Sequence, residues 1–175
     1  MYARDHHDLG TPAASGAPIM LEIDGVAVTV PAGTSVMRAA ALASRDIPRL
    51  CATDTLKAFG SCRVCLVAIE GRKGFPASCT TEVAEGMKVH TQSPALRRLR
   101  RGVLELYVSE HPMGSCPVES RCELETLAES HGIERSRFAD DESVRALRTP
   151  KPVDASNPYF RFDPKRYGRI KPVAN

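Results

Sequence analysis

Four cysteines between residues 51 and 79 restrict the possible folds of this chain more than any other feature. Cys51, Cys62, Cys65 and Cys79 are spaced C-x10-C-x2-C-x13-C. A close pair from one turn, with one further thiol on each side, can surround a metal centre, because deprotonated cysteines bind iron and zinc. Iron–sulfur clusters are held by cysteine sets of this kind. The sequence therefore predicts a cysteine-rich loop wrapped around a cluster, and electron transfer is the leading hypothesis.

Zinc and disulfides are the alternative interpretations of the same cysteines. Structural zinc sites with four cysteines usually have two tight C-x2-C pairs, and only one such pair is present among these four. Residues 1–17 are polar and lack the basic start and apolar middle of a signal peptide. Six cysteines without an export signal indicate a reducing compartment, where metal binding is more common than disulfides. We therefore expect a cytoplasmic protein.

Charge and hydropathy exclude other classes of function. The net charge is only +3 over 175 residues, although Arg97, Arg98, Arg100 and Arg101 lie close together. No aromatic residues alternate with these arginines, which argues against binding of single-stranded nucleic acid. The cluster indicates either the solvated face of a helix or a docking patch for an acidic partner. No apolar stretch approaches the roughly 20 residues of a membrane span, so none is predicted.

The first half of the chain predicts an α+β fold of the β-grasp type. Apolar residues alternate over residues 21–30 and are interrupted by Asp24-Gly25, a strong hairpin signal. Thr34 or Ser35 can cap a helix that extends to about Ser44. Three further strands are expected at residues 65–69, 77–83 and 87–91. This ferredoxin-like domain is predicted over residues 18–92, after a disordered leader at 1–17.

The second half predicts two helices and a tail. Ser93-Pro94 is a favourable helix start, and the helix should continue to about Glu110. Its apolar stripe, expected to pack against the first domain, consists of Leu96, Leu99, Val103, Leu106 and Tyr107. A second helix is expected over residues 120–130, which completes a helical segment at 93–134. Residues 135–175 are charged and proline-rich and predict an extended or disordered tail.

Residues 50–54, 59–67 and 76–81 carry a family resemblance. They resemble the N-terminal ferredoxin-like domain of the alpha subunit of NAD-dependent, molybdenum- or tungsten-containing formate dehydrogenases. They are also similar to the matching domain of the large iron–sulfur subunit of respiratory complex I and to the small diaphorase subunit of NAD-reducing hydrogenases. The resemblance implies a [2Fe–2S] cluster. Cys51 and Cys62 would hold one iron, and Cys65 and Cys79 the other.

The chain retains only some of the ligands of a second metal site that this family has. Relatives carry a His-Pro motif and three cysteines that hold a [4Fe–4S] cluster. Here His111 matches the histidine, Cys116 and Cys122 match the last two cysteines, and Ser115 marks the lost ligand on a shortened loop. We expect two ordinary thiols here rather than an intact [4Fe–4S] cluster. A labile centre with three ligands is the other alternative.

The resemblance implies a one-electron carrier rather than an enzyme by itself, with no catalytic residues. Its partners would be a flavin-bearing, NADH-oxidising subunit and a formate dehydrogenase-type catalytic chain. The alternative is an assembly, regulatory or vestigial iron–sulfur protein that docks to such a complex, since the chain resembles the truncated head of a larger enzyme. A stand-alone oxidoreductase ranks last, because neither G-x-G-x-x-G nor a P-loop is present.

Overall fold

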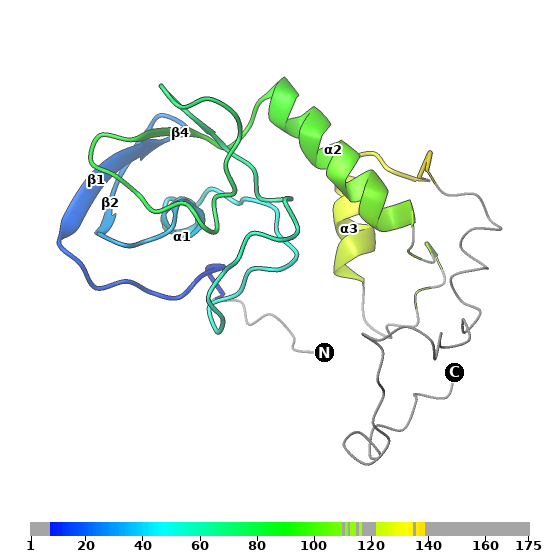
Figure 1. Cartoon of the computed structure of the whole chain (residues 1–175), viewed down its shortest axis with the longest axis horizontal. Coiled ribbons are helices and arrows are strands. Elements are labelled where there is room, and N and C mark those ends of the chain that lie inside the picture. Colours follow the sequence, from blue (N-terminus) through cyan, green and yellow to red (C-terminus); the bar gives the residue numbers. More distant parts are fainter. Residues whose placement is uncertain are drawn as a thin grey trace, which may run out of the picture.

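A small mixed sheet forms one end of the molecule (Figure 1). The computed structural model describes residues 8–109, 111, 113–114, 116, 122–134 and 136–138. The strand order is β2-β1-β4-β3, and β1 is parallel to β4 while the other neighbours are antiparallel. The strands are β1 (Pro18–Ile23), β2 (Val26–Pro31), β3 (Ala68–Ile69) and β4 (Lys88–His90). Together with the helices, this arrangement confirms the predicted α+β ferredoxin-like fold.

The hairpin and the first helix follow the sequence pattern closely. Asp24 and Gly25 form the β1–β2 turn with positive φ angles of 49° and 79°, as a two-residue hairpin turn requires. Ser35 caps α1 (Val36–Leu42), and its side chain accepts a hydrogen bond from the backbone N–H of Arg38 at 3.1 Å. Leu21 and Ile23 point into the core, which α1 covers.

Two of the predicted strands are shorter than expected. The strand predicted at 65–69 is reduced to β3, and residues 77–83 form only the isolated bridges Leu66–Ala77 and Ser35–Glu82. The chain turns after Ala77, whose carbonyl accepts hydrogen bonds from the backbone N–H of Thr80 and the hydroxyl of Thr81. This turn carries Cys79 inward, so the segment cannot remain extended.

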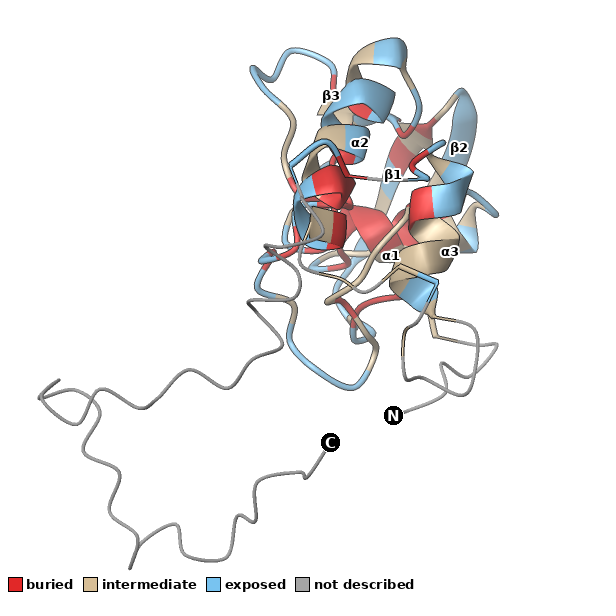
Figure 2. Ribbon diagram, turned by 90° about the vertical axis from the view of Figure 1, so that its right-hand side faces the viewer, coloured by how far each residue is buried: buried red, intermediate tan, exposed pale blue. Residues whose placement is uncertain are grey.

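The long helix presents a different face to the core than its apolar stripe indicates. Leu96, Leu104 and Val108 are buried on α2 (Pro94–Ser109), as expected of an amphipathic helix. Three residues that the sequence pattern predicted to be buried are exposed instead: Leu99, Leu106 and Tyr107. The prediction was wrong for these three because Arg100 is buried instead. Figure 2 shows the resulting mixture of buried and exposed segments along α2.

Two hydrophobic clusters meet at the cysteine loop. The first joins the sheet and α1 and includes Cys65 and Cys79. The second joins α2 and α3 (Glu123–Ser130) and includes Cys62, with Cys51 packed against it. The four cysteines thus lie at the junction of the two clusters. Among the described residues, no helix has the length and apolar character needed to cross a membrane.

The two ends of the chain depart in part from the predicted leader and tail. Residues 8–11 are not a free leader, because Asp8, Leu9 and Thr11 form hydrogen bonds with residues 53–54. In the predicted tail, Ser136 is buried and its hydroxyl donates to the Glu105 carbonyl at 2.9 Å. Residues 1–7 and 139–175 lie outside the described part of the chain.

Candidate metal centre

The loop that carries Cys62 and Cys65 depends on two backbone positions with positive φ. Gly60 has a φ of 70°, and a Cβ atom there would lie 3.3 Å from the Thr80 Cγ2 atom. A side chain at this position would therefore be both strained and crowded. Arg63 adopts a φ of 55° between the two cysteines, which reverses the chain. These two positions shape the loop that carries both thiols.

The four predicted ligands come together as two pairs of sulfur atoms. The Sγ atoms of Cys65 and Cys79 lie 3.4 Å apart. Cys51 and Cys62 form the second pair, joined by a side-chain hydrogen bond. A tetrahedral ion with metal–sulfur bonds of about 2.3 Å holds two of its sulfurs roughly 3.8 Å apart, close to the Cys65–Cys79 separation. The pairs are those expected if each binds one of two irons.

Hydrogen bonds within the loop favour thiolates at two of the four positions. The side-chain hydrogen bond with Cys79 lowers the pKa of Cys65 to about 6 and outweighs the effect of burial. The same interaction, together with burial, raises the pKa of Cys79. Burial opposes ionisation of Cys51, but hydrogen bonds from Cys62 and Ser61 lower its pKa overall. Each pair thus contains one sulfur that ionises readily, as metal binding requires.

Backbone groups surround the sulfurs, as expected for a loop wrapped around a cluster. The Cys51 sulfur interacts with the backbone of Ser61 and Cys62, and the Cys62 sulfur with that of Val64. Cys62, Cys65 and Cys79 are each at most 4 % exposed. Hydrogen bonds to the sulfurs and limited solvent exposure are the features that tune the potential of an iron–sulfur cluster. The donor set therefore fits a buried four-thiolate cluster.

Arg100 is a further component of the site, and its sequence context gave no sign of this role. Its side chain is 2 % exposed, and Nη2 donates to the carbonyls of Leu66 and Thr91 at 2.5 and 2.9 Å. Burial lowers the pKa of Arg100, while the nearby charge of Cys65 opposes that shift. This guanidinium fastens α2 to the residue that follows Cys65 and places a positive charge near the sulfur.

Asp8 and Asp54 connect the N-terminal segment to the loop before the metal centre. Asp8 Oδ1 lies 3.2 Å from Arg49 Nη1, and Asp8 Oδ2 accepts a hydrogen bond from Thr53 Oγ1 at 2.9 Å. Asp54 in turn accepts from the backbone N–H groups of Leu9 and Thr11. Arg49 and residues 53–54 flank Cys51 in the chain, so their contacts with the N-terminal segment help to fix the position of the first cysteine.

We expect the contribution of Asp8 to stability to depend on pH. Although burial opposes ionisation, hydrogen bonds from Gly10 and Thr53 and the charge of Arg49 lower its folded-state pKa. A lowered pKa stabilises the fold above the ordinary aspartate value of about 4, and this stabilisation is lost as pH falls through the folded value. Asp8→Asn should lower the free energy of unfolding by roughly 1–3 kcal/mol at neutral pH.

Thermal unfolding of both proteins between pH 3 and 7 checks this prediction. The difference between Asp8→Asn and the unchanged chain should shrink toward acidic pH. Asp46→Asn is the control, since it removes the carboxylate of an exposed aspartate. A difference that stays constant with pH would show that the Asp8 charge does not stabilise the fold.

The second predicted site brings three potential ligands together. The ligand atoms of His111, Cys116 and Cys122 all lie within 4.8 Å of one another, although the residues come from separate segments. The Cys122 Sγ atom is 3.6 Å from His111 Nε2. The sequence favoured two ordinary thiols here, which stays a prediction; the structure places both thiols close to His111. Ser115 lies outside the described residues.

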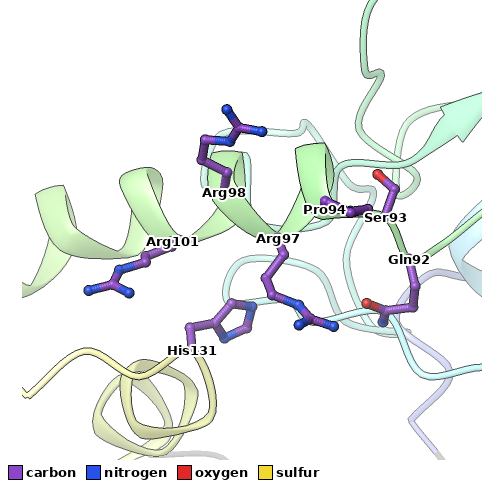
Figure 3. Close-up of a pocket in the computed structure, with 7 residues that line it drawn as sticks. All are labelled: Gln92, Ser93, Pro94, Arg97, Arg98, Arg101 and His131. Carbon is purple, nitrogen blue, oxygen red and sulfur yellow. The ribbon is translucent and has the colours of Figure 1, made fainter.

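The arginine cluster divides into two parts. Figure 3 shows Arg97 and Arg101 directed to the side of α2 where His131 lies, and Arg98 directed away from it. Arg97, Arg98 and Arg101 are exposed and border a shallow cavity of about 580 Å³. Arg100 is the exception, because its side chain points into the core. Three of the four arginines thus form the solvated face that the sequence allowed, with a charge suited to an acidic surface.

Comparisons with known proteins agree with this geometry. Residues 16–94 match a family described as a 2Fe-2S iron-sulfur cluster binding domain. The mitochondrial NADH-ubiquinone oxidoreductase 78 kDa subunit of Candida albicans is 38 % identical over 134 residues, which cover 75 % of this chain and 18 % of that protein. The NADP-reducing hydrogenase subunit HndD of Solidesulfovibrio fructosivorans is 40 % identical over 131 residues, covering 71 % and 22 %. The chain thus spans less than a quarter of either relative.

A solved structure shows the same likeness. The structure of an NAD+-reducing [NiFe]-hydrogenase in the H2-reduced state superimposes with a TM-score of 0.65 and 32 % sequence identity. The match covers 81 % of this chain and 58 % of that one. The predicted similarity to the iron–sulfur subunit of complex I and to NAD-reducing hydrogenases is therefore confirmed.

Proposed function

Because residues 16–94 form a domain of the 2Fe-2S iron-sulfur cluster binding family, we propose that this chain relays single electrons through one [2Fe–2S] cluster held by Cys51, Cys62, Cys65 and Cys79. The observation that carries the proposal is the arrangement of these thiols as two close pairs at the junction of two hydrophobic clusters. Such a cluster exchanges one electron at a potential set by its charge, hydrogen bonds and exposure.

The relatives support an NADH-oxidising complex as the setting. Their names describe subunits of an NADH-ubiquinone oxidoreductase and of an NADP-reducing hydrogenase. We place the chain between a flavin-bearing subunit that oxidises NADH and a separate catalytic chain, in the cytoplasm. The resemblance of residues 50–54, 59–67 and 76–81 favours a molybdenum or tungsten formate dehydrogenase-type chain as that catalytic partner.

Surface features near the cluster loop suit docking to such partners. Leu56 and Phe59 are 65 % and 72 % exposed and belong to the segment between Cys51 and Cys62. Apolar side chains beside a redox centre allow a partner to approach the centre closely, since electron transfer needs short separations. Arg97, Arg98 and Arg101 add a basic surface that favours encounter with an acidic partner.

Iron and acid-labile sulfide per chain, measured after anaerobic purification, test the cofactor assignment. We expect two irons, two sulfides and one spin-half EPR signal after reduction with dithionite. Zinc at the four cysteines without sulfide would contradict the proposal. NADH alone should leave the cluster oxidised, whereas NADH with a catalytic amount of the flavin-bearing subunit from the same organism should reduce it. Failure of that reduction, with the cluster present, would favour the assembly or regulatory alternative.

A further inference from the structure

We propose that His111, Cys116, Cys122 and Glu125 form a binding site for a single divalent metal ion of the zinc type, separate from the two-iron centre. Three of these residues already place their ligand atoms within 4.8 Å of one another. Glu125 lies outside this group of three, but its Oε1 atom is 3.4 Å from His111 Nε2, and its carboxylate would move toward the two sulfurs to become the fourth ligand. Two thiolates, an imidazole and a carboxylate are the types of ligand that zinc accepts in tetrahedral sites.

The observed separations match one tetrahedral ion. With a zinc–sulfur bond of about 2.3 Å and a zinc–nitrogen bond of about 2.05 Å, two ligands on one ion lie about 3.6 Å apart. The observed distance between Cys122 Sγ and His111 Nε2 is 3.6 Å. A nitrogen and a carboxylate oxygen on the same ion lie about 3.4 Å apart, which equals the His111–Glu125 distance. His111 Nε2 is therefore suitably placed relative to two different ligands at once.

A four-iron cluster does not suit the same arrangement. In a [4Fe–4S] cluster each protein ligand binds a different iron, so the cluster body separates the ligands by more than a single ion does. The three ligand atoms within 4.8 Å of one another leave room for one ion between them.

The local structure positions these groups before any metal binds. His111 follows the end of α2, and its backbone N–H donates to the Val108 carbonyl at 3.1 Å. Cys122 is the N-cap of α3 but makes no side-chain capping bond, so its sulfur is directed elsewhere. Glu125 lies in the first turn of α3 and accepts from the Gly114 N–H at 2.9 Å. A bound ion would fasten the end of α2 to the start of α3.

Partial burial supports a retained ion. The side chains of His111 and Glu125 are 17 % and 22 % exposed, and Met113 beside them packs against the second hydrophobic cluster. An ion with four protein ligands leaves no open position for substrate, as is typical of structural zinc sites. We therefore expect this metal to stabilise the α2–α3 pair rather than to take part in catalysis.

Metal analysis of the full chain with its two-iron cluster assembled tests the proposal. We expect one zinc per chain in addition to two irons and two sulfides. Cys122→Ser and His111→Ala should each lose the zinc and keep the irons and sulfides. Glu125→Gln should retain zinc with weaker affinity, because an amide is a poorer ligand than a carboxylate. His90→Ala is the matched control: His90 is exposed on β4, and its loss should leave the zinc content unchanged.

Replacement of zinc by cobalt in the unchanged chain tests the site without any substitution. After removal of zinc with EDTA, Co2+ added to the unchanged chain should give the intense visible bands of tetrahedral thiolate–cobalt, and returning Zn2+ should raise the unfolding temperature.

Three results would overturn the proposal: absence of both zinc and the cobalt bands, four additional irons with sulfide, or a Cys116–Cys122 disulfide found by mass spectrometry under non-reducing conditions. The iron, sulfide and EPR signals of the two-iron cluster are read independently, so this site can fail while the electron-relay function stands.

Discussion

Cys65→Ser should remove the two-iron cluster from the chain, with iron and sulfide per chain falling from two to nearly zero. Cys65 is 1 % exposed, and its side-chain hydrogen bond with Cys79 lowers its pKa to about 6, so this thiol ionises at neutral pH. A serine hydroxyl remains protonated at that pH and does not replace a thiolate on iron. Iron and sulfide analysis, visible absorption and EPR of the reduced protein measure the loss.

Loss of the cluster should also destabilise the fold around it. Cys65 and Cys79 lie in the first hydrophobic cluster and Cys62 in the second, so a metal centre bonded to all of them links the two. Binding energy of this kind contributes to folding. Cys116→Ser is the control for iron and sulfide content alone, because Cys116 lies outside the four ligands and belongs to the proposed zinc site. Full iron content in Cys65→Ser would show that the ligand assignment is wrong.

Arg100→Met should have the second large effect, lowering the free energy of unfolding by about 2–5 kcal/mol. Methionine fills a similar volume but donates no hydrogen bonds, so the Leu66 and Thr91 carbonyls would lose the donors they have in the interior. Unsatisfied buried acceptors are costly because they have also lost water. Urea unfolding followed by circular dichroism measures the change.

The same substitution should lower the reduction potential of the cluster. A positive charge near Cys65 favours the added electron, and methionine removes that charge. Redox titration of the EPR signal measures this shift. Arg98→Met is the control, since Arg98 is exposed and should change stability by no more than about 0.5 kcal/mol. An unchanged potential in Arg100→Met would mean that the guanidinium acts only through packing.

The sequence predicted the elements whose signals are local. Asp24-Gly25 between alternating runs indicated the hairpin, and Ser35 before a run of alanines indicated the cap and helix α1. Ser93-Pro94 likewise indicated the start of α2, where the Ser93 hydroxyl accepts from the Leu96 N–H at 3.1 Å. Each signal depends on backbone preferences within a few residues, so no distant contact was needed to interpret it.

Contacts between distant segments were not predictable in this way. Arg100 resembled its exposed neighbours in sequence, and only the carbonyls of Leu66 and Thr91 explain its burial. Arg100 is buried on α2 while Leu99 and Leu106 face outward, against the apolar stripe. The position of residues 8–11 similarly depends on hydrogen bonds with Asp54, which lies 43 residues beyond Thr11 in the chain.

The cysteine spacing by itself predicted an iron–sulfur centre and favoured the fold that holds it, because ligand number and spacing limit which centres can bind. The family resemblance implied that the cluster has two irons. The tertiary structure decided how the sulfurs pair, which arginine lies beside them, and that His111, Cys116 and Cys122 converge with Glu125 at the ends of α2 and α3. These features are distances between segments remote in sequence. They are fixed when the two hydrophobic clusters pack, and no local pattern encodes them.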